Sequence, residues 1–203
     1  MTDAGTRWNE IRDILNRGRR STGHFAIASV DADGVPNITP VGTVFFRNDR
    51  TAFYFDQYTS ALTSNLETNS HVCLMAVDRG TWFWFRSLLS GRFPAAPGVR
   101  LYGTAGPRRP ATDSELTQVR RRVRPMWIFR GGRMLWSDFS HVRDITFTSA
   151  RPVRYPVMMS HLNQADSVPL SDPETADQQA VDATPDRNDY AAATLRKVWS
   201  VIR

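Results

Sequence analysis

Three consecutive strand patterns early in the chain limit the fold more than any other feature of this sequence. Residues 25–30 (FAIASV) alternate as a strand, and 31–34 (DADG) forms a tight turn because glycine tolerates positive φ and aspartate hydrogen-bonds its own turn. Segment 35–46 contains two prolines, which cannot donate to a strand ladder, so its first half is predicted to be an edge or bulged strand. Residues 51–55 (TAFYF) form the third strand after a polar turn. The sequence therefore predicts an antiparallel meander.

The rest of the first 160 residues adds strands and a few helices. An amphipathic helix is expected from a Thr6 cap to Gly18, a short helix over about 60–67, and a helix opened by the capping box of Thr112 and Glu115. Strands are expected at 71–77, at the aromatic run 81–85, at 99–105 where Gly103 marks a bulge or close approach, and at 142–148, with a loop over 86–98. This pattern is typical of a small, mainly β barrel with helices.

Beyond the barrel the composition changes. Residues 161–189 are predicted to be an acidic flexible linker, since 163–189 hold seven acidic residues and one arginine. Residues 190–203 regain helix formers and are predicted to form a C-terminal amphipathic helix. The expected organisation is a domain over 1–160, the linker, and that helix.

Charge and cysteine content exclude several classes of protein. The 203 residues include 26 basic and 20 acidic side chains, a net charge of +6, and Lys197 is the only lysine. A basic balance alone indicates non-specific association, and the aromatic run is not interleaved with arginines, so we expect no nucleic-acid site. The single Cys73 excludes an intramolecular disulfide and a multi-cysteine zinc site. We find neither a membrane-spanning segment nor a signal peptide, and expect a cytoplasmic protein.

Four motifs, in order, resemble the pyridoxamine 5′-phosphate oxidase-like, FMN-binding split β-barrel family. Residues 25–42 resemble its opening strand, Asp-Gly turn and proline-containing strand. Residues 60–69 (SALTSNLETN) resemble its Ser-x-Lys-x-x-Asn-Leu-x-x-Asn segment, and 99–105 (VRLYGTA) its V-R-V-x-G-x-A strand, which a capped helix follows as here.

The resemblance implies a six-stranded antiparallel split β-barrel that forms a homodimer, with FMN at the subunit interface. It places the isoalloxazine ring of FMN against 39–43, the phosphate beside a loop at 58–60, and a helix asparagine and a strand arginine nearby. The implied cofactor-binding residues are Thr39, Val41, Gly42, Thr43, Tyr58, Thr59, Ser60, Asn65 and Arg100.

The family's phosphate-binding cations are missing. Leu62, Ala61 and Pro40 stand where the family has a lysine and two arginines. A phosphate needs charge-assisted donors to offset its desolvation. Helix-start N–H groups and Ser60 supply part of this, and the cations have to come from elsewhere, for example Arg47, Arg50 or an arginine of a second subunit.

Other candidate sites are weaker. The arginines at 108–109 and 120–124 are first interpreted as cations that complement a helix dipole, with an anion-binding surface as the alternative. The four histidines lack zinc-site spacing, and each is first interpreted as structural. His24 and His161 remain alternative axial haem ligands, since some relatives of this barrel bind haem. Cys73 is expected to be a buried small hydrophobe.

The sequence therefore predicts an FMN-dependent oxidoreductase that acts on a small molecule. The catalytic residues are unknown and no metal is expected. The alternatives are a haem-binding or haem-degrading split-barrel protein, deazaflavin F420 in place of FMN, or a cofactor-less barrel used as a binding module.

Overall fold

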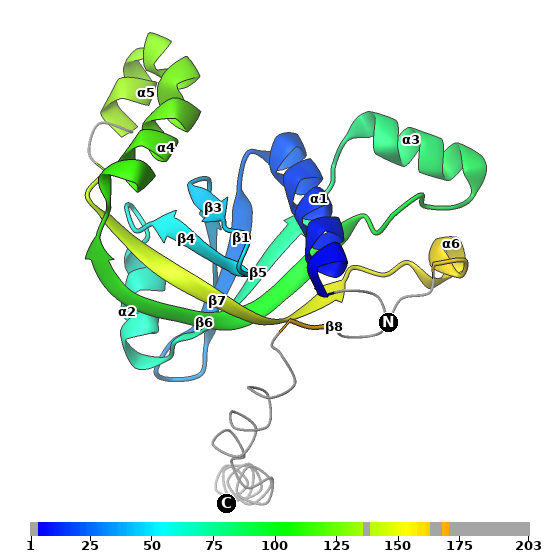
Figure 1. Ribbon diagram of the computed structural model, residues 1–203, viewed down its shortest axis with the longest axis horizontal. Helices are drawn as coiled ribbons and strands as arrows, with labels where there is room; N and C mark the ends of the chain where they lie inside the picture. The colour runs from blue at the N-terminus through cyan, green and yellow to red at the C-terminus, as the bar shows by residue number, and fades with distance from the viewer. Residues whose placement is uncertain (1–3, 136–138, 163–167, 171–203) are drawn as a thin grey trace, which may run out of the picture. The chain divides into compact units, whose positions relative to one another are not determined.

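The computed structural model describes residues 4–135, 139–162 and 168–170, which form one antiparallel sheet with helices around it (Figure 1). The strands are β1 (Phe25–Val30), β2 (Pro36–Val41), β3 (Val44–Phe46), β4 (Thr51–Phe55), β5 (His71–Val77), β6 (Gly98–Pro110), β7 (His141–Pro152) and β8 (Val168–Pro169). The helices are α1 (Ala4–Thr22), α2 (Ser60–Thr68), α3 (Thr81–Ser90), α4 (Asp113–Val123), the 3-10 helix η1 (Arg124–Ile128), α5 (Arg130–Leu135) and α6 (Pro156–Met159).

The strand order, β2-β1-β5-β6-β7-β4-β3, confirms the expected mainly β split barrel. The sheet curls into a half-barrel in Figure 1, and β8 pairs with β7 beside it. The sheet has more than the six strands expected, partly because segment 35–46 forms two strands instead of one. β2 pairs with β1 at one end of the strand order, and β3 pairs with β4 at the other. The bend at Gly42–Thr43 therefore crosses from one edge of the described sheet to the other.

Helix α1 packs on the sheet through Trp8, Ile11 and Leu15, all buried in the main core cluster. The expected cap at Thr6 is wrong, since α1 begins at Ala4, and so is the expected end at Gly18, since α1 continues to Thr22. A Cβ atom at Gly18 would lie 3.0 Å from the Cβ of Ala76. This glycine therefore serves the close packing of α1 against β5 and not helix termination.

The two longest strands, β6 and β7, bend where their pairing shifts register. One shift lies between Tyr102 and Gly103, as the glycine in this strand predicted. A Cβ atom at position 103 would lie 2.0 Å from the carbonyl oxygen of Thr146. The approach of the two backbones therefore requires glycine here, and the bulge adds to the curvature of the sheet.

The aromatic run 81–85 is a helix, so the predicted strand there is wrong, as is the start of the loop predicted over 86–98. Helix α3 ends at Gly91, which has a left-handed φ of 66° and a backbone N–H bonded to the Leu88 carbonyl oxygen. A short apolar run is compatible with the period of a helix or of a strand, and the glycine that caps the C-terminus favours the helix here. Trp82 is 73% exposed and stacks on Phe85, whereas Trp84 packs on the buried Phe93.

The capping box that opens α4 is confirmed, since the Thr112 hydroxyl accepts from the Glu115 backbone and the Glu115 carboxylate accepts from the Thr112 backbone. Residues 168–170 of the segment predicted as a linker carry β8 and a buried Leu170. The rest of that prediction beyond 162, and the predicted C-terminal helix, lie outside the described residues. Among the helices of the described residues, none is long and apolar enough to cross a membrane.

Candidate functional site

The bend between β2 and β3 brings four of the predicted flavin residues together. Thr39 and Val41 share the inner face of β2, opposite Ile27 and Phe25 of β1, and Val41 is buried. Gly42 is exposed and Thr43 half-buried, and neither is paired in the sheet. The bend thus offers backbone N–H groups and a hydroxyl at the edge of the sheet, which are the groups needed to hydrogen-bond the polar rim of a flat ring.

The predicted phosphate loop leads into helix α2. Tyr58 is 73% exposed and has a positive φ of 59°, and Ser60 is exposed in the first turn of the helix. Asn65 instead faces inward, where its amide Nδ2 donates to the Ser29 hydroxyl at 3.0 Å. Asn65 therefore fixes α2 to β1 and does not point at the loop.

Thr59 belongs to a buried ionic cluster centred on Asp56. The hydroxyls of Thr59 and Thr63 both donate to one oxygen of the Asp56 carboxylate at 2.5 Å. Nε of Arg143 donates to the other oxygen at 2.9 Å, and Nε of Arg108 lies 3.7 Å from it. Burial alone would raise the pKa of Asp56, but the three hydrogen bonds lower it below its ordinary value.

This cluster decides how well the loop fits a phosphate. The donors that line the loop from inside are already engaged by a carboxylate, which would repel a second anion. Leu62, at the family's lysine position, is fully buried, and Ala61 and Pro40 carry no charge. The loop at 58–60 therefore does not fit the phosphate of FMN in the way that the family resemblance implies.

Arg100 lies away from both segments. In the strand pairing it shares a row with Met75, Ala26 and Pro40, so β6 is three strand spacings, roughly 14 Å, from β2 at this level. Residues of one row share a face of the sheet, and Arg100 is exposed on the face opposite to Thr39. The structure thus does not bring Arg100 together with the β2–β3 bend.

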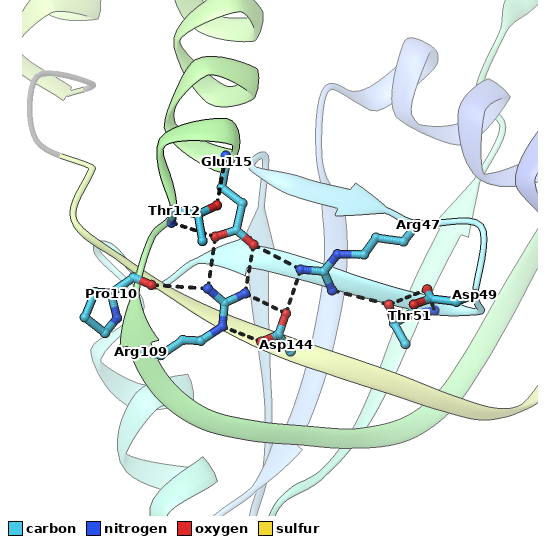
Figure 2. A network of polar contacts seen from close by, with 8 residues as sticks. All are labelled: Arg47, Asp49, Thr51, Arg109, Pro110, Thr112, Glu115 and Asp144. Carbon is cyan, nitrogen blue, oxygen red and sulfur yellow. Dashed lines mark hydrogen bonds and ion pairs between the residues drawn. The ribbon is translucent and has the colours of Figure 1, made fainter.

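A second ionic network lies at the start of α4 (Figure 2). The guanidinium of Arg109 donates to both oxygens of Glu115 at 2.8 and 3.0 Å and to both oxygens of Asp144 at 2.6 and 2.9 Å. Nη2 of Arg47 donates to Glu115 at 3.0 Å and to Asp144 at 2.8 Å. The hydrogen bonds from Arg109 lower the pKa of Glu115 to about 2 and also lower that of Asp144.

The two arginines named as substitutes for the phosphate cations are therefore engaged inside the fold. Arg47 is held by two carboxylates and lies over the Phe53 ring, with its guanidinium carbon 4.8 Å from the centroid. Arg50 donates to the carbonyl oxygen of Leu170. The sequence did not reveal these partners, because Glu115 and Asp144 lie far from Arg47 along the chain.

The histidines and the cysteine show no arrangement of a metal or nucleophilic site. Within the described residues, no three His, Cys, Asp or Glu side chains form a metal-binding group. The ring of His24 contacts the Thr22 carbonyl oxygen at 3.0 Å, and that of His161 contacts the Phe93 carbonyl oxygen at 2.9 Å. Cys73 is half-buried and not fully buried as expected, and partial burial raises the pKa of its thiol.

The comparisons with known proteins agree with this fold. The family model described as pyridoxamine 5'-phosphate oxidase matches residues 9–136, more than half of the chain, and no curated protein matches the sequence. The chain therefore belongs to the pyridoxamine 5'-phosphate oxidase family.

Solved structures with a similar fold include an FMN-binding protein from Syntrophomonas wolfei, with 13% identity, a TM-score of 0.49, and coverage of 74% of this chain and 94% of that one. HutZ, the heme storage protein from Vibrio cholerae, has 19% identity, a TM-score of 0.40, and coverage of 71% and 92%. A third structure reaches a TM-score of 0.54 at 13% identity and covers 83% of this chain and 95% of its own. At these identities the likeness concerns the fold alone.

Proposed function

We propose that this chain is an FMN-dependent oxidoreductase that acts on a small molecule, and that it works as a homodimer in the cytoplasm. Membership of the family supports this proposal. The observation that carries it is the β2–β3 bend, where Gly42 and Thr43 lie outside the strand pairing and their backbone N–H groups face the edge of the sheet. When bound, the flavin supplies the electron or hydride transfer, and the chain supplies orientation and hydrogen bonds.

The ring and the phosphate of FMN place different demands on the chain. The bend fits the ring, since Thr39 and Thr43 add hydroxyls beside the open backbone. The loop at 58–60 does not fit the phosphate, because Asp56 occupies its inner donors. The proposal therefore requires that the phosphate be held by other cations of this chain or of a second subunit.

Flavin binding is the direct test. The full-length protein is purified, its absorbance spectrum recorded, and released ligands identified by mass spectrometry, before and after incubation with FMN. We expect the two visible flavin bands and a saturable quench of FMN fluorescence. Protein that neither retains nor acquires flavin would remove the proposal.

A matched pair of variants locates the ring. A Cβ atom at Gly42 would lie 3.4 Å from the Gly23 carbonyl oxygen, so the fold accommodates Gly42→Ala, whose methyl group projects at the bend. We expect Gly42→Ala to weaken flavin binding severalfold, and Gly131→Ala, in α5, to leave it unchanged. Equal flavin affinity in both variants would place the ring elsewhere.

The proposed homodimer is supported by an exposed apolar surface on η1 and its flanking residues. Met126 is 48% exposed, Ile128 79% and Phe129 69%, and neighbouring exposed apolar side chains of this kind are typical of an interaction surface. Light scattering coupled to size-exclusion chromatography should give twice the chain mass, and Ile128→Glu should shift the protein toward the monomer. A monomeric wild-type protein would contradict this part of the proposal.

A second candidate is a cofactor-free barrel that serves as a binding module. The observation that favours it is the buried Asp56 carboxylate, which already accepts from the Thr59 hydroxyl of the loop where the family resemblance expects the phosphate. Failure to bind FMN, deazaflavin F420 or haem in the same absorbance experiment, with an intact fold by circular dichroism, is the outcome that supports this candidate.

A further inference from the structure

A separate group of arginines converges on a pocket between α1, β3 and α4. The pocket has a volume of about 220 Å³. Its lining consists of Arg12, Asn16 and Arg19 of α1, residues 44–46 of β3, and Gln118 and Arg122 of α4. Three arginines thus line one small space whose lining includes no carboxylate, although charge compensation is the rule for buried arginines.

Arg122 is the fixed member of the group. Its Nη1 donates to the carbonyl oxygen of Val44 at 2.6 Å and to that of Gly42 at 3.4 Å, and its guanidinium carbon lies 3.4 Å from the centroid of the Phe45 ring. These contacts orient the group but leave Nε and Nη2 for another acceptor. Burial, and then the positive charge of Arg19, lower the pKa of Arg122 to about 10, so it stays a cation at neutral pH.

The two arginines of α1 complete the pocket. Arg12 and Arg19 are seven residues apart, which is two helical turns, and so lie on one face of the helix. Arg12 donates to the neutral Asn48 side chain at 2.6 Å. Within the described residues the side chain of the half-buried Arg19 has no hydrogen-bond or ion-pair partner. Among the residues that the structure describes, none of the three arginines is thus paired with a carboxylate.

We propose that this pocket binds the phosphate group of a small phosphate monoester. A phosphate presents several oxygens in a tetrahedral arrangement, so guanidinium groups approaching from two helices can each engage it, whereas a planar carboxylate offers only two oxygens. The amides of Asn16 and Gln118 add neutral donors. The volume is below the roughly 300–1,000 Å³ of pockets for whole drug-sized ligands, so the pocket takes the anionic group and not the entire molecule.

This pocket is not the phosphate loop that the family resemblance implies. It shares no residue with 58–60, and it touches the proposed ring segment only through the bond from Arg122 to the Gly42 carbonyl oxygen. The phosphate has two possible sources, the flavin itself or a phosphorylated substrate. Only the first source rests on the proposed function.

Direct binding to the full-length protein tests the site without flavin. Inorganic phosphate and phenyl phosphate are titrated by calorimetry in phosphate-free buffer into the wild type and into Arg12→Gln and Arg19→Gln, neither of which contacts a ring. Each loss of a charge-assisted donor should weaken binding about tenfold. The controls are Arg20→Gln and Arg121→Gln, the exposed neighbours on the same helices, and they should stay within about twofold.

Two results would overturn the assignment. If phosphate binding did not saturate, or if the control variants weakened it equally, the arginines would form only a diffuse basic surface and no site. Succinate binding as tightly as phenyl phosphate would mean that the pocket does not select phosphate.

Comparing FMN with riboflavin, which lacks the phosphate, separates the two sources. If the flavin phosphate occupies the pocket, Arg19→Gln weakens FMN binding about tenfold and leaves riboflavin binding unchanged, and inorganic phosphate competes with FMN. If a substrate occupies it, phenyl phosphate binds together with FMN. Phosphate binding without any flavin binding supports this site and contradicts the proposed function, so the two failures are distinguishable.

Discussion

Helix α4 contributes to two arginine groups that have opposite electrostatic character. At its first turn, Glu115 shares Arg47 and Arg109 with Asp144, so that two positive charges meet two negative ones. At its last turn, Arg122 faces Arg12 and Arg19 in a pocket without a carboxylate. The same residue type is therefore structural where the fold supplies an acid and is available to a ligand where it does not.

The largest effect is expected where an arginine and its acid are both buried. Asp56→Ala leaves the Arg143 guanidinium, 5% exposed, without its carboxylate, and should lower the free energy of unfolding by about 3–5 kcal/mol. Urea denaturation followed by circular dichroism measures this. The exposed Asp113→Asn in α4 should change stability by less than about 0.5 kcal/mol, and an equally small loss in Asp56→Ala would show that this pair is not structural.

The second largest loss of stability is expected for the paired arginines at the start of α4. Glu115→Gln removes a carboxylate that is 7% exposed and binds both Arg47 and Arg109, and it weakens the capping box. We expect a loss of about 2–3 kcal/mol, smaller than for Asp56 because both arginines are about one-third exposed and keep Asp144. If Glu115→Gln left the free energy of unfolding unchanged, the arginines at the start of α4 would be no more structural than those at its end.

Low pH should weaken the ion pairs of Glu115 at the start of α4 and leave the unpaired arginines at its end unaffected. The pKa of Glu115 falls from about 4.5 to about 2 on folding, so the carboxylate contributes stability that is complete above its unfolded pKa and is lost as the pH falls toward 2. Its loss is on the order of 2 kcal/mol between pH 5 and pH 2. Unfolding curves at several pH values should show this slope in the wild type and a reduced slope in Glu115→Gln. Parallel slopes would contradict the assignment.

The smallest expected change in the free energy of unfolding is a gain and not a loss. Arg19→Gln removes one of the uncompensated charges, so in low-salt, phosphate-free buffer it should leave stability unchanged or raise it by up to about 0.5 kcal/mol. Added phosphate should then stabilise the wild type more than the variant, because ligands that bind the native state raise the melting temperature. A clear destabilisation by Arg19→Gln in that buffer would show that Arg19 has a structural partner.

The sequence predicted those elements whose signals are local. The Asp-Gly turn, the two prolines of the edge strand, the Thr112 and Glu115 box, and Gly103 each act within a few residues of their position, and all are confirmed. Helix α3 was missed because alternating aromatic residues fit a strand as well as a short helix. Gly18 was misinterpreted because its neighbour, Ala76, lies on another element.

The candidate site was less predictable, since its character depends on partners far along the chain. Nothing near Arg47 or Arg143 in the sequence shows that carboxylates 68 and 87 residues away will engage them. The departures at Ala61 and Leu62 did predict that this loop lacks the family's phosphate-binding cations. The convergence of Arg12 and Arg19 with Arg122 appears only when α1 and α4 lie beside β3.

The bulge at Gly103 also bears on how this fold can be recognised in other sequences. Any side chain at that position would place its first carbon inside the Thr146 carbonyl group, so a chain that bends β6 over β7 in this way has no substitute for glycine. The glycine at position 103 is therefore a single letter of the sequence that reports the geometry of two strands.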